Sequence, residues 1–173
     1  AYNRILLQLK ALGVKFIDPV VGNSTQHINI LYPNISFNKK NKAPKDNINN
    51  ASVLYQICLD GKSMLFTGDI ETEGWETVST CKPYLCDSTY YCISHHGSIT
   101  GHHRNNCIPA GRIITTLADC ADLTELQVLM GRDGAYKGVF SKKVTSAFSN
   151  IIKTEDAAHY IEIEWSSGRY DKR

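Results

Sequence analysis

The sequence predicts an α/β (α+β) domain. Two observations favour this class: residues 51–67 have the pattern of a β-hairpin, and helix-like and strand-like segments alternate after it. With 173 residues, of which 42% are hydrophobic and 21% charged, the chain has the size and composition of one globular domain with a substantial core. A formal net charge of +2 is too small to indicate a nucleic-acid-binding protein.

The first part of the chain is predicted to hold a helix, two short strands and a long loop. Residues 2–12 carry apolar side chains at helical spacing and end at Gly13, a common residue at the C-terminal end of a helix. Residues 14–17 and 27–32 have strand patterns, each followed by a proline. Residues 34–50 are rich in Asn and Lys and are expected to form an exposed loop.

The middle of the chain is predicted to form a hairpin, a helix and a strand. Residues 51–59 and 62–67 flank Asp60-Gly61, which is a strong turn signal. Residues 71–81 then favour a helix with acidic residues near its start, and residues 88–93 favour a buried strand.

The last part of the chain is predicted to alternate strand, helix and strand. Residues 112–117 favour a buried strand, residues 142–152 an amphipathic helix, and residues 159–165 an alternating strand with one wet face.

Polar side chains follow two of these strands at the point where each strand ends. Asp69 comes after residues 62–67, and His95 and His96 follow residues 88–93. If the two strands are adjacent and parallel, these side chains lie together at one edge of the sheet. Carboxylate oxygen and imidazole nitrogen suit zinc, manganese or iron. The alternative is that Asp69 caps the following helix and that the histidines lie in a polar loop.

Two segments carry a resemblance to a known family. Met64-Leu65-Phe66-Thr67-Gly68-Asp69 and Ser94-His95-His96-Gly97-Ser98, with Asn49-Asn50-Ala51-Ser52 upstream, resemble motifs of the metallo-β-lactamase superfamily. Within that superfamily the likeness is to the hydrolase domain of competence-type DNA-uptake channel proteins and their stand-alone relatives. The resemblance covers roughly residues 1–120 and implies the C-terminal half of an αββα sandwich.

The family's first metal motif, His-x-His-x-Asp-His, is absent from this sequence. We therefore expect residues 1–173 to be a single C-terminal part of a metallo-hydrolase domain whose N-terminal half is missing. Half of a sandwich leaves one apolar sheet face uncovered, so we expect the missing half or a second copy of the chain to cover it.

The resemblance implies a metal-dependent hydrolase that acts on phosphodiester or related ester bonds. The complete protein would hold two divalent metal ions, Zn or Mn, bridged by Asp69, with one of His95 and His96 as a further ligand. Of the two we favour His95, which leaves His96 and Ser98 to contact a neighbouring group or the substrate. Without the upstream ligands the fragment is expected to be inactive. The alternative function is a non-catalytic or effector-associated interaction module with the same fold.

Other features bear on location and on further candidate residues. No apolar run approaches about 20 residues, so no transmembrane span is expected. The six cysteines form no Cys-x-x-Cys pair and are expected to be reduced thiols in a cytoplasmic protein. Three residues of a glycine-flanked loop, His102, His103 and Arg104, are expected to be solvated. Where competence-type relatives often carry His-Pro, residues 132–139 contain neither, which weakens the case for a nuclease substrate.

Overall fold

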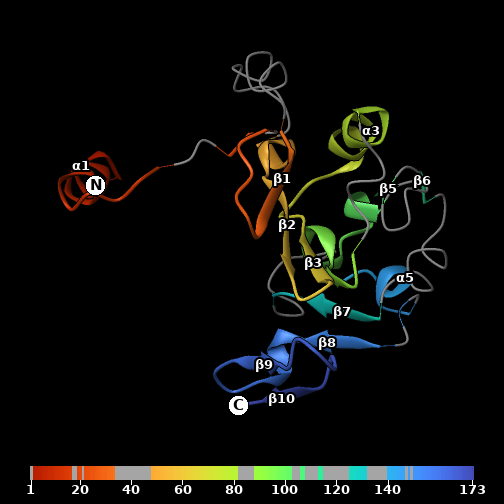
Figure 1. Ribbon diagram of the computed structural model, residues 1–173. Coiled ribbons are helices and arrows are strands. Elements are labelled where there is room, and N and C mark those ends of the chain that lie inside the picture. Colours follow the sequence, from red (N-terminus) through yellow and green to blue (C-terminus); the bar gives the residue numbers. More distant parts are fainter. Residues whose placement is uncertain are drawn as a thin grey trace.

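The described part of the chain is built on a six-stranded mixed sheet (Figure 1). The computed structural model describes residues 2–16, 19–20, 22–33, 48–81, 88–102, 106–107, 113–114, 125–131, 140–146, 148 and 150–173. The strands of the sheet, in spatial order, are β1 (Ile28–Tyr32), β2 (Leu54–Leu59), β3 (Lys62–Phe66), β4 (Tyr90–Cys92), β7 (Leu126–Leu129) and β8 (Ile151–Lys153).

The sheet has an antiparallel half and a parallel half, so the predicted α/β (α+β) class is confirmed. β1 pairs with β2 and β2 with β3 in antiparallel fashion, and β3, β4, β7 and β8 are parallel to one another. The hairpin turn forms because Asp60 and Gly61 take φ values of 49° and 75°, the left-handed geometry that tight hairpins need. Since β3 and β4 are parallel neighbours, the segments after Phe66 and Cys92 leave the same edge of the sheet.

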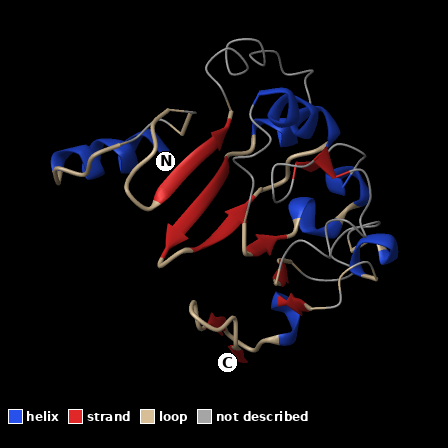
Figure 2. Ribbon diagram, turned by 45° about the vertical axis from the view of Figure 1, so that its right-hand side comes forward, coloured by secondary structure: helices blue, strands red, loops and turns tan. Residues whose placement is uncertain are grey.

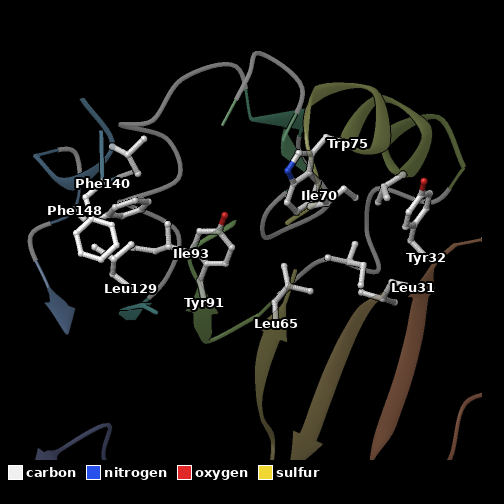
Figure 3. Packing of buried hydrophobic residues seen from close by; sticks show 13 residues of the cluster. Leu31, Tyr32, Leu65, Ile70, Trp75, Tyr91, Ile93, Leu129, Phe140 and Phe148 are labelled. Carbon is white, nitrogen blue, oxygen red and sulfur yellow. The ribbon is translucent and has the colours of Figure 1, made fainter. Parts of the chain in front are cut away.

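Helices cover one face of the sheet. α3 (Thr72–Cys81) and α5 (Lys142–Thr145) pack there, over the main hydrophobic cluster that Figure 3 shows. Buried residues of this cluster are Leu31, Tyr32, Leu54, Leu65, Ile70, Trp75, Val78, Tyr91, Ile93, Leu129, Phe140, Val144 and Phe148. By contrast, Figures 1 and 2 show α1 (Tyr2–Ala11) apart from the sheet, and its Ile5 and Leu7 are exposed.

A C-terminal hairpin covers part of the other face. It is formed by β9 (Ile161–Ile163) and β10 (Tyr170–Lys172), and Trp165 between them packs edge-on against Tyr90 with ring centroids 5.4 Å apart. The second buried cluster lies under it and comprises Met64, Tyr90, Cys92, Leu126, Val128 and Ile152. Further along this face, Ile28, Ile30, Tyr55 and Ile57 are only partly buried.

Several segment predictions are wrong. Residues 14–16 form no strand, because no strand in the described part of the chain pairs with them; residue 17 lies outside the described residues. The loop expected at 34–50 ends earlier, because Ile48–Ala51 form the 3-10 helix η1 with Asn50 buried, while residues 34–47 lie outside the description. The helix expected at 142–152 stops at Thr145, because Ile151 and Ile152 pair with β7 as the strand β8.

Other strands differ from the expectation in extent or in partner. The strand expected at 159–165 is limited to Ile161–Ile163, because the chain turns back at Gly168, where φ is 71°, to form a hairpin. Of residues 112–117, only Ile113–Ile114 are described, as β6, which pairs with β5 (Asn106–Cys107) outside the main sheet. β7, in the parallel half, was not predicted. No helix in the described ranges is long and apolar enough to traverse a lipid bilayer.

Candidate functional site

The loop that carries Asp69 is held by residues just upstream of β2. The hydroxyl of Ser52 accepts a hydrogen bond from the Asp69 backbone N–H at 2.9 Å. The side-chain oxygen of Asn50 accepts one from the backbone N–H of Glu71, also at 2.9 Å. A Cβ on Gly68, where φ is 56°, would meet the side chain of Ser52 at 3.0 Å. The Asn-x-x-Ser segment therefore fixes the backbone that presents Asp69.

The loop that carries the histidines follows β4 and contacts the Asp69 loop directly. The His95 backbone N–H donates to the Gly68 carbonyl at 2.9 Å, and the Thr67 hydroxyl donates to the Cys92 carbonyl at 3.1 Å. The segment Ser94–Gly97 forms the 3-10 helix η3, in which His95 and His96 both take left-handed backbone conformations, with φ of 47° and 52°. Such conformations are costly for residues other than glycine and concentrate at functional sites.

Asp69 and His96 face each other across the two loops. Nε2 of His96 lies 3.2 Å from Oδ1 of Asp69, and the two side chains are 44% and 43% exposed. Nδ1 of His96 lies 2.9 Å from the Met130 carbonyl oxygen, which can only accept, so this nitrogen carries the proton. The expected proximity of Asp69 to one of the two histidines is confirmed. The residue that faces Asp69 is His96, not His95.

His95 belongs to a second carboxylate–imidazole pair. Its Nδ1 lies 3.0 Å from Oε1 of Glu71, and the two side chains are 21% and 17% exposed. Glu71 also accepts hydrogen bonds from Asn49 at 3.2 Å and from Thr100 at 3.1 Å. Sequence analysis identified Glu71 only as an acidic residue near the start of a helix and missed its pairing with His95. The Asn-x-x-Ser segment, which supplies the side chains of Asn49 and Asn50 that bind Glu71, was the signal that could have indicated its role.

The remaining candidates lie beside this cluster or outside the described residues. Ser98 makes a 3.0 Å hydroxyl contact with Thr100 and donates its backbone N–H to the His95 carbonyl. His102 ends the 3-10 helix η4 (Ile99–His102), and the structure does not describe its side chain. His103, Arg104 and residues 132–139 are outside the described ranges.

An apolar pocket of about 200 Å³ borders Asp69 and His96. Its other lining residues are Val53, Tyr55, Phe66, Gly68, Cys92, Ile93 and Met130. Tyr55 and Phe66 stack in its wall with ring centroids 4.9 Å apart. Burial raises the pKa of the Cys92 thiol to about 12, so at neutral pH this pocket offers a thiol and no thiolate.

The Asp69–His96 pair has the chemistry and spacing of two ligands of one divalent ion. Oxygen and nitrogen donors about 2.1 Å from a tetrahedral metal lie about 3.4 Å from each other, close to the observed 3.2 Å. Since the Nδ1 proton points to Met130, an unprotonated Nε2 would direct its lone pair at a carboxylate oxygen. A cation or a second proton between them removes this repulsion.

The pair alone does not complete a metal site. Zinc sites in proteins use three or four protein donors. Among the described residues, no group of three or more His, Cys, Asp or Glu side chains is placed to hold a metal ion. The rings of His95 and His96 have centroids 6.4 Å apart, so the two carboxylate–imidazole pairs are neighbours, each with two donors.

Comparison with known proteins leaves the motifs and the geometry as the basis for assigning a function. No family model, curated protein or solved structure matches this chain. The resemblance to the metallo-β-lactamase superfamily therefore stays a prediction from the two motifs.

Proposed function

We propose that this chain contributes part of the active site of a metal-dependent hydrolase of the metallo-β-lactamase type, acting on phosphodiester or related ester bonds. The contact between Asp69 and His96 supports this proposal most directly. It joins the two motifs that carry the family resemblance, at the edge where adjacent parallel strands end. The orientation of His96 by a backbone carbonyl is typical of metal-binding histidines.

In this proposal Asp69 and His96 each donate to a divalent ion, Zn or Mn, in the complete protein. When bound, such ions acidify a water molecule and orient it for attack on an ester. Asp69 holds its carboxylate beside the pocket because Ser52 fixes its backbone, and Met130 directs Nε2 of His96 toward it. The other donors come from a missing N-terminal half or from a second copy, which also covers the partly buried sheet face around Ile57.

A second candidate function is a non-catalytic interaction module, as in an effector-associated protein. The count of donors favours it, because within the described residues no third ligand accompanies Asp69 and His96. The free thiols among the described cysteines, Cys58 and Cys92, are compatible with the cytoplasmic location that we propose for either function.

Metal titration and hydrolysis assays on the full-length protein separate the two functions. The variants Asp69→Ala and His96→Ala should each lose Zn²⁺ or Mn²⁺ binding by calorimetry and lose turnover of bis(p-nitrophenyl) phosphate. Matched controls are Asp171→Ala and His159→Ala, which remove an exposed carboxylate and an exposed imidazole from the C-terminal hairpin region. Undiminished metal content and turnover in the site variants would sink the hydrolase proposal. A folded wild type that binds no metal would favour the interaction module.

A further inference from the structure

The loop after β7 brings a backbone carbonyl against His96. β7 ends at Leu129, and the carbonyl oxygen of the next residue, Met130, lies 2.9 Å from Nδ1 of His96. Gly131 follows with a φ of 121°, a conformation that side-chain-bearing residues rarely adopt. A Cβ on Gly131 would lie 3.2 Å from Nδ1 of His96 and 3.4 Å from the ring of Phe140. The loop therefore depends on glycine to approach the imidazole this closely.

The hydroxyl of Thr154 binds the backbone of this loop at Gly131. Oγ1 of Thr154 accepts a hydrogen bond from the Gly131 backbone N–H at 2.9 Å and donates one to the Gly131 carbonyl at 3.2 Å. Both backbone polar groups of Gly131 are thus bound by one side chain. Thr154 reaches this position because β8 pairs in parallel with β7 in a register that aligns Lys153 with Leu129.

We infer that Thr154 is a positioning residue for His96, acting through the Met130–Gly131 backbone. The hydroxyl restrains Gly131, the restrained loop presents the Met130 carbonyl, and this carbonyl keeps the proton on Nδ1 of His96. Nε2 then lies beside Asp69 and can offer its lone pair to a metal ion. This inference rests on the proposed function, because it assigns Thr154 to the orientation of a metal ligand. Partners of a metal-bound histidine typically change metal affinity by about 10–100-fold.

The test compares two substitutions of similar size in the full-length protein. Thr154→Val removes the hydroxyl and keeps the branched shape, whereas Thr154→Ser keeps the hydroxyl. In the metal-free protein, the ring ¹⁵N chemical shifts of His96 should show Nδ1 protonated in wild type and Thr154→Ser, and a mixture of tautomers with and without that proton in Thr154→Val. Zn²⁺ binding should weaken about 10-fold in Thr154→Val alone. Thr145→Val is the control, because the Thr145 hydroxyl donates to the carbonyl of Ser141, the residue before α5, and so lies outside the proposed chain of contacts.

The inference is overturned if Thr154→Val keeps the wild-type tautomer and affinity, or if the valine and serine variants behave alike. Thr154→Ala provides the same comparison if the valine variant does not fold. If wild type binds no Zn²⁺, the proposed function fails, while the ¹⁵N shifts of the metal-free proteins still decide whether Thr154 orients His96.

Discussion

Nε2 of His96 lies 3.2 Å from Oδ1 of Asp69, and within the described residues this contact, not a helix cap, engages the Asp69 carboxylate. Asn50 accepts from the Glu71 backbone N–H in front of α3. We therefore expect Asp69→Ala to change the free energy of unfolding of the metal-free protein by less than about 1 kcal/mol, since the lost contact is about half exposed. Urea denaturation followed by circular dichroism measures this change.

The helix-cap alternative for Asp69 predicts the opposite pattern. Loss of a cap costs about 1 kcal/mol and leaves metal binding unchanged. A clear destabilisation of Asp69→Ala with retained Zn²⁺ affinity would therefore contradict the ligand assignment.

Asn50 should matter more for stability than Asp69. It is 3% exposed, its side-chain oxygen binds the Glu71 N–H, and its amide donates to Glu73 at 3.3 Å. Asn50→Ala removes both hydrogen bonds, so we expect it to lower the free energy of unfolding by about 1–3 kcal/mol. The comparison is Asn49→Ala, because the neighbouring Asn49 is only partly buried. Equal urea midpoints for the two variants would show that Asn50 does not hold this loop.

The position of the site could be predicted because it depends on strand order, whereas the choice between His95 and His96 could not. Adjacent parallel strands bring their ends together whatever the loop conformation, and the motifs marked both ends. The direction of each imidazole depends on the backbone after the strand. Because both histidines take positive φ, alternation along an extended strand did not identify which of them faces Asp69.

The fold could be predicted where local signals were strong. Asp60 and Gly61 readily adopt the backbone conformation of a tight turn, so the sequence correctly predicted the hairpin of β2 and β3. By contrast, residues 142–152 have helical periodicity, but Ile151 and Ile152 pair with β7 instead, which buries Ile152 completely. This pairing is non-local, and β7 itself is short, so sequence periodicity carried little information about either strand.

Gly74→Ala has two opposing effects on the stability of α3. Alanine favours a helix interior over glycine by about 1 kcal/mol. However, a Cβ on Gly74 would lie 2.5 Å from Cγ1 of Ile70 and 2.8 Å from Oδ1 of Asn50. Ile70 is fully buried, so overpacking should dominate, with a net loss of about 1–2 kcal/mol. Gly61→Ala is the comparison. A Cβ on Gly61 would have no atom within 4 Å, so the loss of stability there should come from backbone strain alone. A higher thermal midpoint for Gly74→Ala would contradict the clash.

Alkaline pH should destabilise the fold through buried acidic groups, with Cys92 as the clearest case. Burial raises the pKa of its thiol from the ordinary 9.0 to about 12. Between these values the unfolded chain releases the proton and the folded chain keeps it, so the stability is fully present below pH 9 and falls as pH rises toward 12. The loss for one such group is at most about 1.4 kcal/mol per pH unit. Burial also raises the pKa of Tyr32, which adds to the loss in the same direction.

Cys92→Ala isolates the contribution of this thiol. The variant should be less stable than wild type at pH 8, because it leaves a cavity in the cluster under the C-terminal hairpin. The difference in free energy of unfolding between wild type and Cys92→Ala should shrink between pH 9 and pH 11, because the variant lacks the thiol that ionises in the unfolded state. Urea unfolding at several pH values measures the difference. Cys58→Ala is the comparison, since Cys58 is less buried and its hydrogen bond from Asn29 partly offsets the burial effect on its pKa. Parallel stability curves for wild type and Cys92→Ala would mean that the Cys92 thiol ionises alike in both states.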